Sequence, residues 1–219
     1  MLWLIRHGQT VANAAGLIQG RSDPPLTELG QRQAQAVAAR LPPQGRILCS
    51  PLGRARHTAE LAAAAHGLPI QVDDRWIELD YGDFEGRPVD HVRHDLWANW
   101  RADPTWAAPG GGESLAAANH RVWPACDELI PEISDGDVVV VTHVGPIKAA
   151  VAWALGVGPE TAWRMHVDPA SVSTVGMGSQ DAPVLLSFND TGHLTAAGVP
   201  RTPTAPRAPG TGGKAGSTG

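Results

Sequence analysis

The sequence predicts a three-layer α/β/α fold with a mostly parallel central sheet. Short apolar runs of strand length alternate with amphipathic segments of helical length along most of the chain. With 219 residues, 42% of them hydrophobic and 18% charged, the chain is long enough to bury a core without disulfides or metals. Strands that alternate with helices favour a parallel sheet covered on both faces.

The expected strands are short and strongly apolar. The four consecutive valines at 138–141 are typical of a strand that is buried on both faces. The five candidate strands are residues 2–5, 47–49, 138–142, 171–177 and 184–188.

Four helices are expected between these runs. In the first, Leu29, Val37 and Leu41 would share one buried stripe. In the third, Pro124 is expected to kink or divide the helix. The first helix begins after Thr27 as N-cap, and the second runs from residue 52 to about 65. The third begins near Glu113–Ser114, and the fourth has Pro146 in its first turn.

Composition limits the cellular setting and the partners. The formal charge of −5 gives no basic field for nucleic acid, and no apolar run approaches the ~18 residues of a membrane span. The apolar start of the chain is too short for a signal peptide. Cys49 and Cys126 are expected to be buried, unpaired thiols. These features predict a cytoplasmic protein that binds neither nucleic acid nor membrane.

Two parts of the chain differ in composition. Residues 1–198 carry all the expected strands and helices and are predicted to form one domain. Residues 199–219 are rich in Pro and Gly and have no large apolar anchor, so we expect a disordered tail there.

The strongest functional signal follows the first strand, which runs directly into Arg6-His7-Gly8. Ligands of α/β proteins bind outside the carboxyl ends of the strands. A histidine there stands on a rigid support, an arginine beside it can hold an anion, and Gly8 would let the backbone approach a phosphate. Taken alone, these three residues fit a surface loop at least as well.

Two further strand ends strengthen the signal. Arg54 lies in the first turn of a helix that follows the second strand, and His143 directly follows the valine-rich strand. Helix N-termini attract anions. A cluster of like charges stabilises a fold poorly but suits a phosphate dianion. The sequence therefore predicts an anion site built from Arg6, His7, Arg54 and His143.

These motifs together resemble the histidine phosphatase superfamily, which includes cofactor-dependent phosphoglycerate mutases and many bacterial phosphatases. The resemblance covers about residues 1–190. It implies that His7 is the phosphorylated nucleophile and Glu78 the general acid, with Asp80 and Asp83 as alternatives. The similar segments, in chain order, are 4–10 with Asn13, 50–59, 78–86, 111–114 and 142–143.

Weaker expectations concern the mouth of the pocket. Val144 stands where the family often has glycine, so its side chain would narrow the pocket while its N–H stays available to phosphate. Trp97, Trp100 and Trp106 either cap the pocket or pack a helical excursion. The residues expected to bind substrate are Gly8, Asn13, Gln19, Gly20, Arg21 and Val144.

The leading functional hypothesis is a phosphoric monoester hydrolase of the histidine acid phosphatase type, acting on small phosphorylated metabolites through a phosphohistidine. No metal or cofactor is expected, because arginines supply the positive charge. The alternatives are a cofactor-dependent phosphoglycerate mutase and a non-catalytic protein that binds a phosphorylated ligand. The short segment between Glu78 and Gly112 favours phosphatase over mutase. The sequence leaves the substrate open, and equally whether the chain forms a homodimer.

Overall fold

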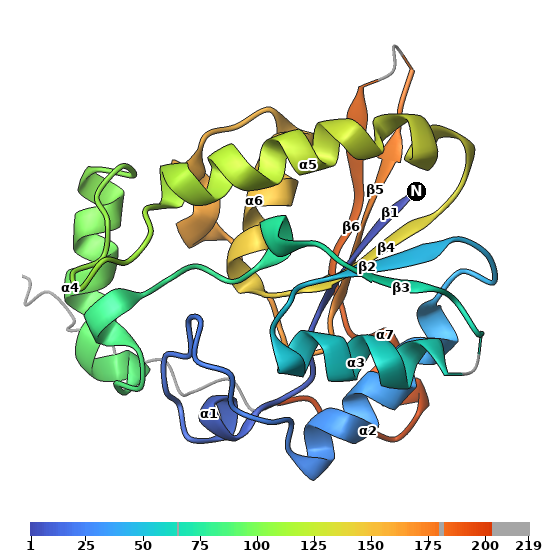
Figure 1. Cartoon of the computed structure of the whole chain (residues 1–219), viewed down its shortest axis with the longest axis horizontal. Coiled ribbons are helices and arrows are strands. Elements are labelled where there is room, and N and C mark those ends of the chain that lie inside the picture. Colours follow the sequence, from blue (N-terminus) through green and yellow to red (C-terminus); the bar gives the residue numbers. More distant parts are fainter. Residues whose placement is uncertain (65, 180–181, 203–219) are drawn as a thin grey trace, which may run out of the picture.

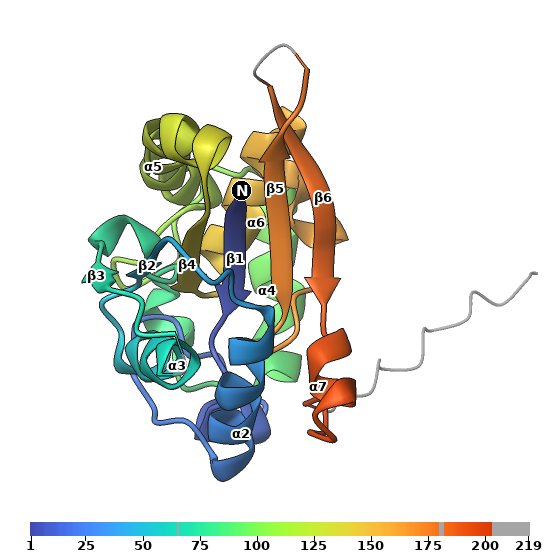
Figure 2. The ribbon, with the colours of Figure 1, turned by 90° about the vertical axis from the view of Figure 1, so that its right-hand side faces the viewer.

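The computed structural model describes residues 1–64, 66–179 and 182–202. Its centre is a six-stranded sheet in the order β3-β2-β4-β1-β5-β6 (Figure 1). The pairs β3–β2, β2–β4 and β4–β1 are parallel, whereas β5 and β6 run antiparallel at one edge (Figure 2). The strands are β1 (Leu2–Arg6), β2 (Arg46–Cys49), β3 (Ile70–Val72), β4 (Val138–Thr142), β5 (Val172–Met177) and β6 (Pro183–Asp190).

Helices cover both faces of the sheet. Leu4 and Val140 pack against α5 (Leu115–Asp135) and α6 (Val144–Leu155), whereas Ile5 and Val141 pack on the opposite face. That second face is covered by α2 (Glu28–Val37), α3 (Gly53–Ala63) and α7 (Gly192–Ala196). Adjacent strand residues point to opposite faces, so the alternation explains why all of β4 is buried. The predicted three-layer fold is confirmed.

A third apolar cluster lies apart from the sheet. It is built around α4 (Val89–Ala102), where Leu96 and Trp100 are buried (Figure 1). The remaining elements are α1 (Val11–Ala14) and the 3₁₀ segments η1 (Ala38–Arg40), η2 (Asp74–Trp76), η3 (Gly82–Phe84) and η4 (Pro159–Arg164).

Most expected elements are confirmed, and the exceptions have physical reasons. The five expected strands are present, but β3, at the sheet edge, was not predicted because its three residues are too few for a recognisable apolar run. Leu29 does not join the buried stripe of α2. Its eight-residue spacing from Val37 turns it about 80° away, and Gly30 lies on the buried face instead.

A kink or a division was expected at Pro124, and the division is wrong, because α5 runs unbroken through both Pro124 and Pro131. A proline inside a helix costs roughly 3 kcal/mol. The apolar stripe of α5, which includes Val122, Cys126 and Leu129 in the main core, offsets that cost.

The expected tail begins with residues that contact the domain. Val199 packs against the α2–α3 core, and Arg201 forms a 2.7 Å ion pair with Asp168. Gln33 donates to the carbonyl of Pro200. Residues 203–219, the rest of that tail, lie outside the described residues.

Two further sequence expectations concern the thiols and the membrane. Cys49 and Cys126 are buried and unpaired, as expected. Among the helices of the described residues, none combines the length and apolarity that crossing a membrane requires.

Candidate active site

The register of the sheet brings the predicted strand ends to one edge. Arg6 pairs with Thr142 across β1 and β4, and Cys49 pairs with Val141 across β2 and β4. His7, Ser50 and His143 each follow one of these strand ends, so the three lie together. The rings of His7 and His143 are 5.1 Å apart between centroids.

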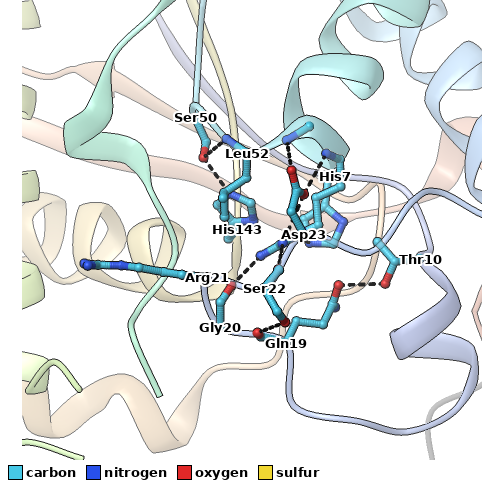
Figure 3. Close-up of polar contacts among 12 residues, drawn as sticks. His7, Thr10, Gln19, Gly20, Arg21, Ser22, Asp23, Ser50, Leu52 and His143 are labelled. Atoms are coloured by element: carbon cyan, nitrogen blue, oxygen red, sulfur yellow. Dashed lines mark hydrogen bonds and ion pairs between the residues drawn. The ribbon is translucent and has the colours of Figure 1, made fainter. Parts of the chain in front are cut away.

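Hydrogen bonds fix both nitrogens of His7. Its Nδ1 lies 2.7 Å from the carbonyl oxygen of Gly8, which can only accept, so Nδ1 carries the proton. Nε2 lies 3.3 Å from Nε of Arg54, which can only donate (Figure 3). Nε2 is therefore left unprotonated, and its lone pair accepts from Arg54.

Burial and neighbouring cations keep both histidines neutral. The His7 pKa falls well below its ordinary 6.5, first because burial disfavours the charged ring and then because Arg54 and Arg6 repel a proton. Burial and Arg54 lower the His143 pKa in the same way. The sequence suggested His143 as part of a cationic cluster, whereas this ring is an uncharged hydrogen-bonding group.

Arg54 is held rigidly by its neighbours. Nη2 donates to the carbonyl of Gly20 at 2.7 Å, and Nη1 donates to that of Ser22 at 2.6 Å. Asp23 accepts from the backbone N–H of Arg54 and lies 3.5 Å from Nη1. These contacts leave Nε directed at Nε2 of His7.

Arg6 presents an unused donor, and His143 presents an unpartnered ring nitrogen. Nη1 of Arg6 donates to the carbonyl of Val167 at 2.7 Å, but Nε is buried with no partner among the described residues. Burial lowers the pKa of Arg6 to about 10, so it stays charged at neutral pH. His143 bonds Ser50 through Nε2 at 2.7 Å, and its buried Nδ1 likewise lacks a described partner. Buried unsatisfied donors are costly, so the site is arranged for an acceptor.

Glu78 is positioned by three backbone N–H groups. Its Oε1 accepts from Leu79 and Gly145, both at 2.9 Å, and its Oε2 accepts from Val144 at 3.2 Å. A side chain on residue 145 would collide with Glu78 and Leu79, so Gly145 permits this arrangement. Glu78 lines the same pocket as Arg6 and His7, whereas Asp80 and Asp83 do not.

Two backbone groups that we expected near a phosphate already have partners. Gly8 was expected to let the backbone approach a phosphate, and its N–H donates to Oγ1 of Thr58. Glycine is needed there because a Cβ would lie 2.3 Å from the carbonyl oxygen of Gly30. The N–H of Val144 is also taken, by Glu78.

Arg21 points away from His7, although we expected it at the pocket mouth (Figure 3). It forms 3.5 Å ion pairs with Asp80 and Glu113 instead. Asn13 and Gln19 line the pocket as expected, and the oxygen of each also contacts Thr10. Their amide nitrogens are the parts that can donate to a substrate.

The catalytic pocket has a volume of about 240 Å³. It is open enough for a phosphoryl group and part of a leaving group. Within the described ranges, no group of three or more His, Cys, Asp or Glu side chains has the arrangement of a metal site. The pocket is lined by Arg6, His7, Asn13, Leu17, Ile18, Gln19, Gly20, Glu78, Tyr81, Val89, Leu96, Trp97 and Val144.

Sequence reasoning missed the residues that support these groups. Ser50 binds His143, Thr58 binds Gly8, and Asp23 with the Ser22 carbonyl holds Arg54. Only Ser50 had a signal, since it directly follows a strand. Lys148, on the first turns of α6, was also missed.

Because both histidines are neutral in the folded state, we expect the fold to lose stability in mild acid. Below about pH 6.5, His7 and His143 bind protons in the unfolded chain but stay unprotonated in the folded state. The free energy of unfolding should therefore be flat above pH 7 and fall below pH 6.5, by up to ~1.4 kcal/mol per pH unit for each histidine. Urea unfolding from about pH 7.5 to 5.5 measures this slope. His143→Asn should reduce it, whereas His120→Asn, at an exposed position, should not. A flat profile would contradict buried neutral histidines.

Comparison with known proteins identifies relatives of this chain. Residues 2–191 match the family model of the histidine phosphatase superfamily (branch 1). The protein named "Probable phosphoglycerate mutase GpmB" of Yersinia enterocolitica is 35% identical over an alignment of 205 positions, which covers 88% of this chain and 94% of the relative.

Solved structures of phosphatases are also similar to this chain. Phosphoserine phosphatase of Entamoeba histolytica, in complex with 3-phosphoglyceric acid, aligns with a TM-score of 0.78 and 28% identity over 88% of this chain and 98% of its own. A mycobacterial glucosyl-3-phosphoglycerate phosphatase in complex with VO₃ aligns with a TM-score of 0.76 and 34% identity over 87% and 98%.

Proposed function

This chain belongs to the histidine phosphatase superfamily, and we propose that it hydrolyses small phosphomonoesters through a phosphohistidine formed on His7. One observation carries the proposal: the unprotonated Nε2 of a buried, neutral His7 faces Arg54 beside the unpartnered donor of Arg6. An unprotonated ring nitrogen beside cationic donors suits nucleophilic attack on a phosphoryl group.

The reaction proceeds in two displacements. Nε2 of His7 attacks phosphorus, the P–O ester bond breaks, and Glu78 gives its proton to the leaving oxygen. Water then attacks the phosphohistidine, Glu78 takes a proton from that water, and the P–N bond electrons return to Nε2. Arg6 and Arg54 stabilise the charge on the phosphoryl oxygens in both transition states.

The first proton has a source in the substrate. Glu78 must carry a proton to act as the general acid. A phosphomonoester carries a proton on its phosphate below about pH 6, and transfer of that proton to Glu78 prepares the acid. The substrate then stands as the dianion between Arg6 and Arg54.

The relatives support a small polar metabolite as substrate. The two structural relatives are named for phosphoserine and for glucosyl-3-phosphoglycerate, both phosphomonoesters. The catalytic pocket of about 240 Å³ fits ligands of that scale better than a folded protein.

Trapping the intermediate tests the proposal. Acid-free quenching of the enzyme during turnover of p-nitrophenyl phosphate should yield an acid-labile, alkali-stable phosphoryl adduct on His7. The adduct should form equally in EDTA, because the arginines supply the charge. His7→Gln should form none, and an adduct on another residue would overturn the assignment.

A mutase is the second candidate, favoured by the 35% identity to the protein named GpmB. Both activities use the same phosphohistidine, but a mutase must keep water away from it. Incubation with 3-phosphoglycerate, with and without bisphosphoglycerate, separates the two. We expect free phosphate as the main product; isomerisation with little free phosphate would favour the mutase.

A further inference from the structure

A second cavity adjoins the catalytic pocket. It has a volume of about 150 Å³ and lies where α4, α5, α6 and η4 meet. In Figure 1, α4 and the start of α5 lie together at one end of the molecule. The two pockets share Tyr81, Trp97 and Val144 as lining residues. A cavity of this size holds a body about as large as a benzene ring.

Small residues open the cavity and aromatic rings close it. Gly145 and Ala149, one helical turn apart on α6, face it from one side. Trp100 and Trp163 form another wall, with their rings stacked 6.0 Å apart between centroids. Such walls favour a flat apolar body.

Three hydrogen-bond donors that line this cavity have no partner among the described residues. Nδ2 of Asn119 and Nε1 of Trp163 are buried with no partner in the described chain. Lys148, half-buried on α6, also lines the cavity and forms no ion pair or hydrogen bond with another described residue. Burial lowers the pKa of Lys148 to about 8, so most of it is charged at neutral pH.

Glu78 does not supply the missing acceptor. Its charge acts on Lys148, but no ion pair or hydrogen bond joins the two side chains, and its oxygens accept the N–H groups of Leu79, Val144 and Gly145. Leaving an ammonium group and two buried N–H donors without acceptors beside an apolar wall costs free energy, unless a ligand supplies the acceptors.

The cavity also lies on the leaving-group side of the site. Glu78 must reach the leaving oxygen to protonate it. Leu79 and Gly145, which both donate to Glu78, line the cavity. A leaving group bonded to that oxygen is therefore directed past Glu78 into this space.

We propose, on the premise that the chain is the phosphomonoesterase argued above, that this cavity binds a ring-sized, flat apolar leaving group whose carboxylate is held by Lys148, Asn119 and Trp163. The ring stacks on the tryptophans, and the carboxylate completes the three donors.

Matched substrates test the charge requirement. We expect kcat/KM for 4-carboxyphenyl phosphate to exceed that for its neutral methyl ester by at least about tenfold, as for a charged hydrogen bond. Lys148→Met should bring the ratio close to one, and Asn119→Leu should lower it severalfold. Loss of folding alone would lower both rates and keep the ratio. Arg164→Met removes an exposed cation on η4 outside the cavity and should keep the ratio too.

A binding measurement separates this site from catalysis. Tryptophan fluorescence should report tighter binding of 4-hydroxybenzoate than of 4-hydroxybenzamide, in the wild type and in His7→Ala alike. Binding without any turnover would refute the proposed function and keep this site. Turnover with a substrate ratio near one, or equal binding of the two phenols, would overturn the inference.

Discussion

Replacing Arg54 by lysine is expected to lower kcat/KM for a phosphomonoester about 10³-fold, the loss seen when a preorganised cationic donor is removed from a phosphoryl-transfer site. Two carbonyls, of Gly20 and Ser22, hold the guanidinium fork so that Nε faces His7. A lysine has one compact ammonium group that cannot satisfy both carbonyls and also reach the phosphoryl oxygens.

The control for this substitution lies on the same helix. Arg56 is exposed on α3, two residues further along, and Arg56→Lys should keep wild-type kinetics. Steady-state rates with p-nitrophenyl phosphate measure both variants, and circular dichroism checks that each is folded. An Arg54→Lys enzyme within about tenfold of wild type would show that Arg54 is structural.

The sequence predicts the position of the site because the fold is periodic. Runs of valine and leucine identify the buried strands, and parallel strands bring their carboxyl ends to one edge. Arg6, His7 and His143 follow those ends directly, so their convergence could be predicted from order alone. Ile70–Val72 could not, since a strand of three residues gives no apolar run long enough to recognise.

The supporting contacts could not be predicted because they depend on backbone geometry between distant loops. The sequence gives no reason to expect a partner for the N–H of Val144, but in the fold this N–H donates to Glu78. Arg21 is close to the site along the chain, yet Asp80 and Glu113 draw it away. The role of Gly8 depends on how closely α2 approaches at Gly30.

The role of Lys148 in the second cavity could not be predicted from the sequence either. Lys148 lies on an apolar helix with no motif around it, and only the packing of η4 and α5 against α6 encloses it. A buried cation is recognised by the absence of a neighbouring acceptor, which is a property of three-dimensional surroundings.

Glu78→Gln is expected to lower kcat for an alkyl phosphate by about 10²- to 10⁴-fold, because the alkoxide leaving group needs a proton in the transition state. The first step with p-nitrophenyl phosphate should slow far less, since nitrophenolate leaves without protonation. Hydrolysis of the phosphohistidine should still slow, because the amide cannot accept the proton of water. The variant should therefore give a burst of nitrophenolate, followed by slow turnover with phosphoenzyme accumulated on His7.

Stopped-flow absorbance and quantitation of the adduct measure these two phases. Asp83→Asn is the matched control, since Asp83 is exposed and lies outside the catalytic pocket, and it should show no burst. Equal losses for the alkyl and nitrophenyl substrates in Glu78→Gln would assign Glu78 to positioning rather than to proton transfer, because only a proton donor distinguishes leaving groups by their basicity.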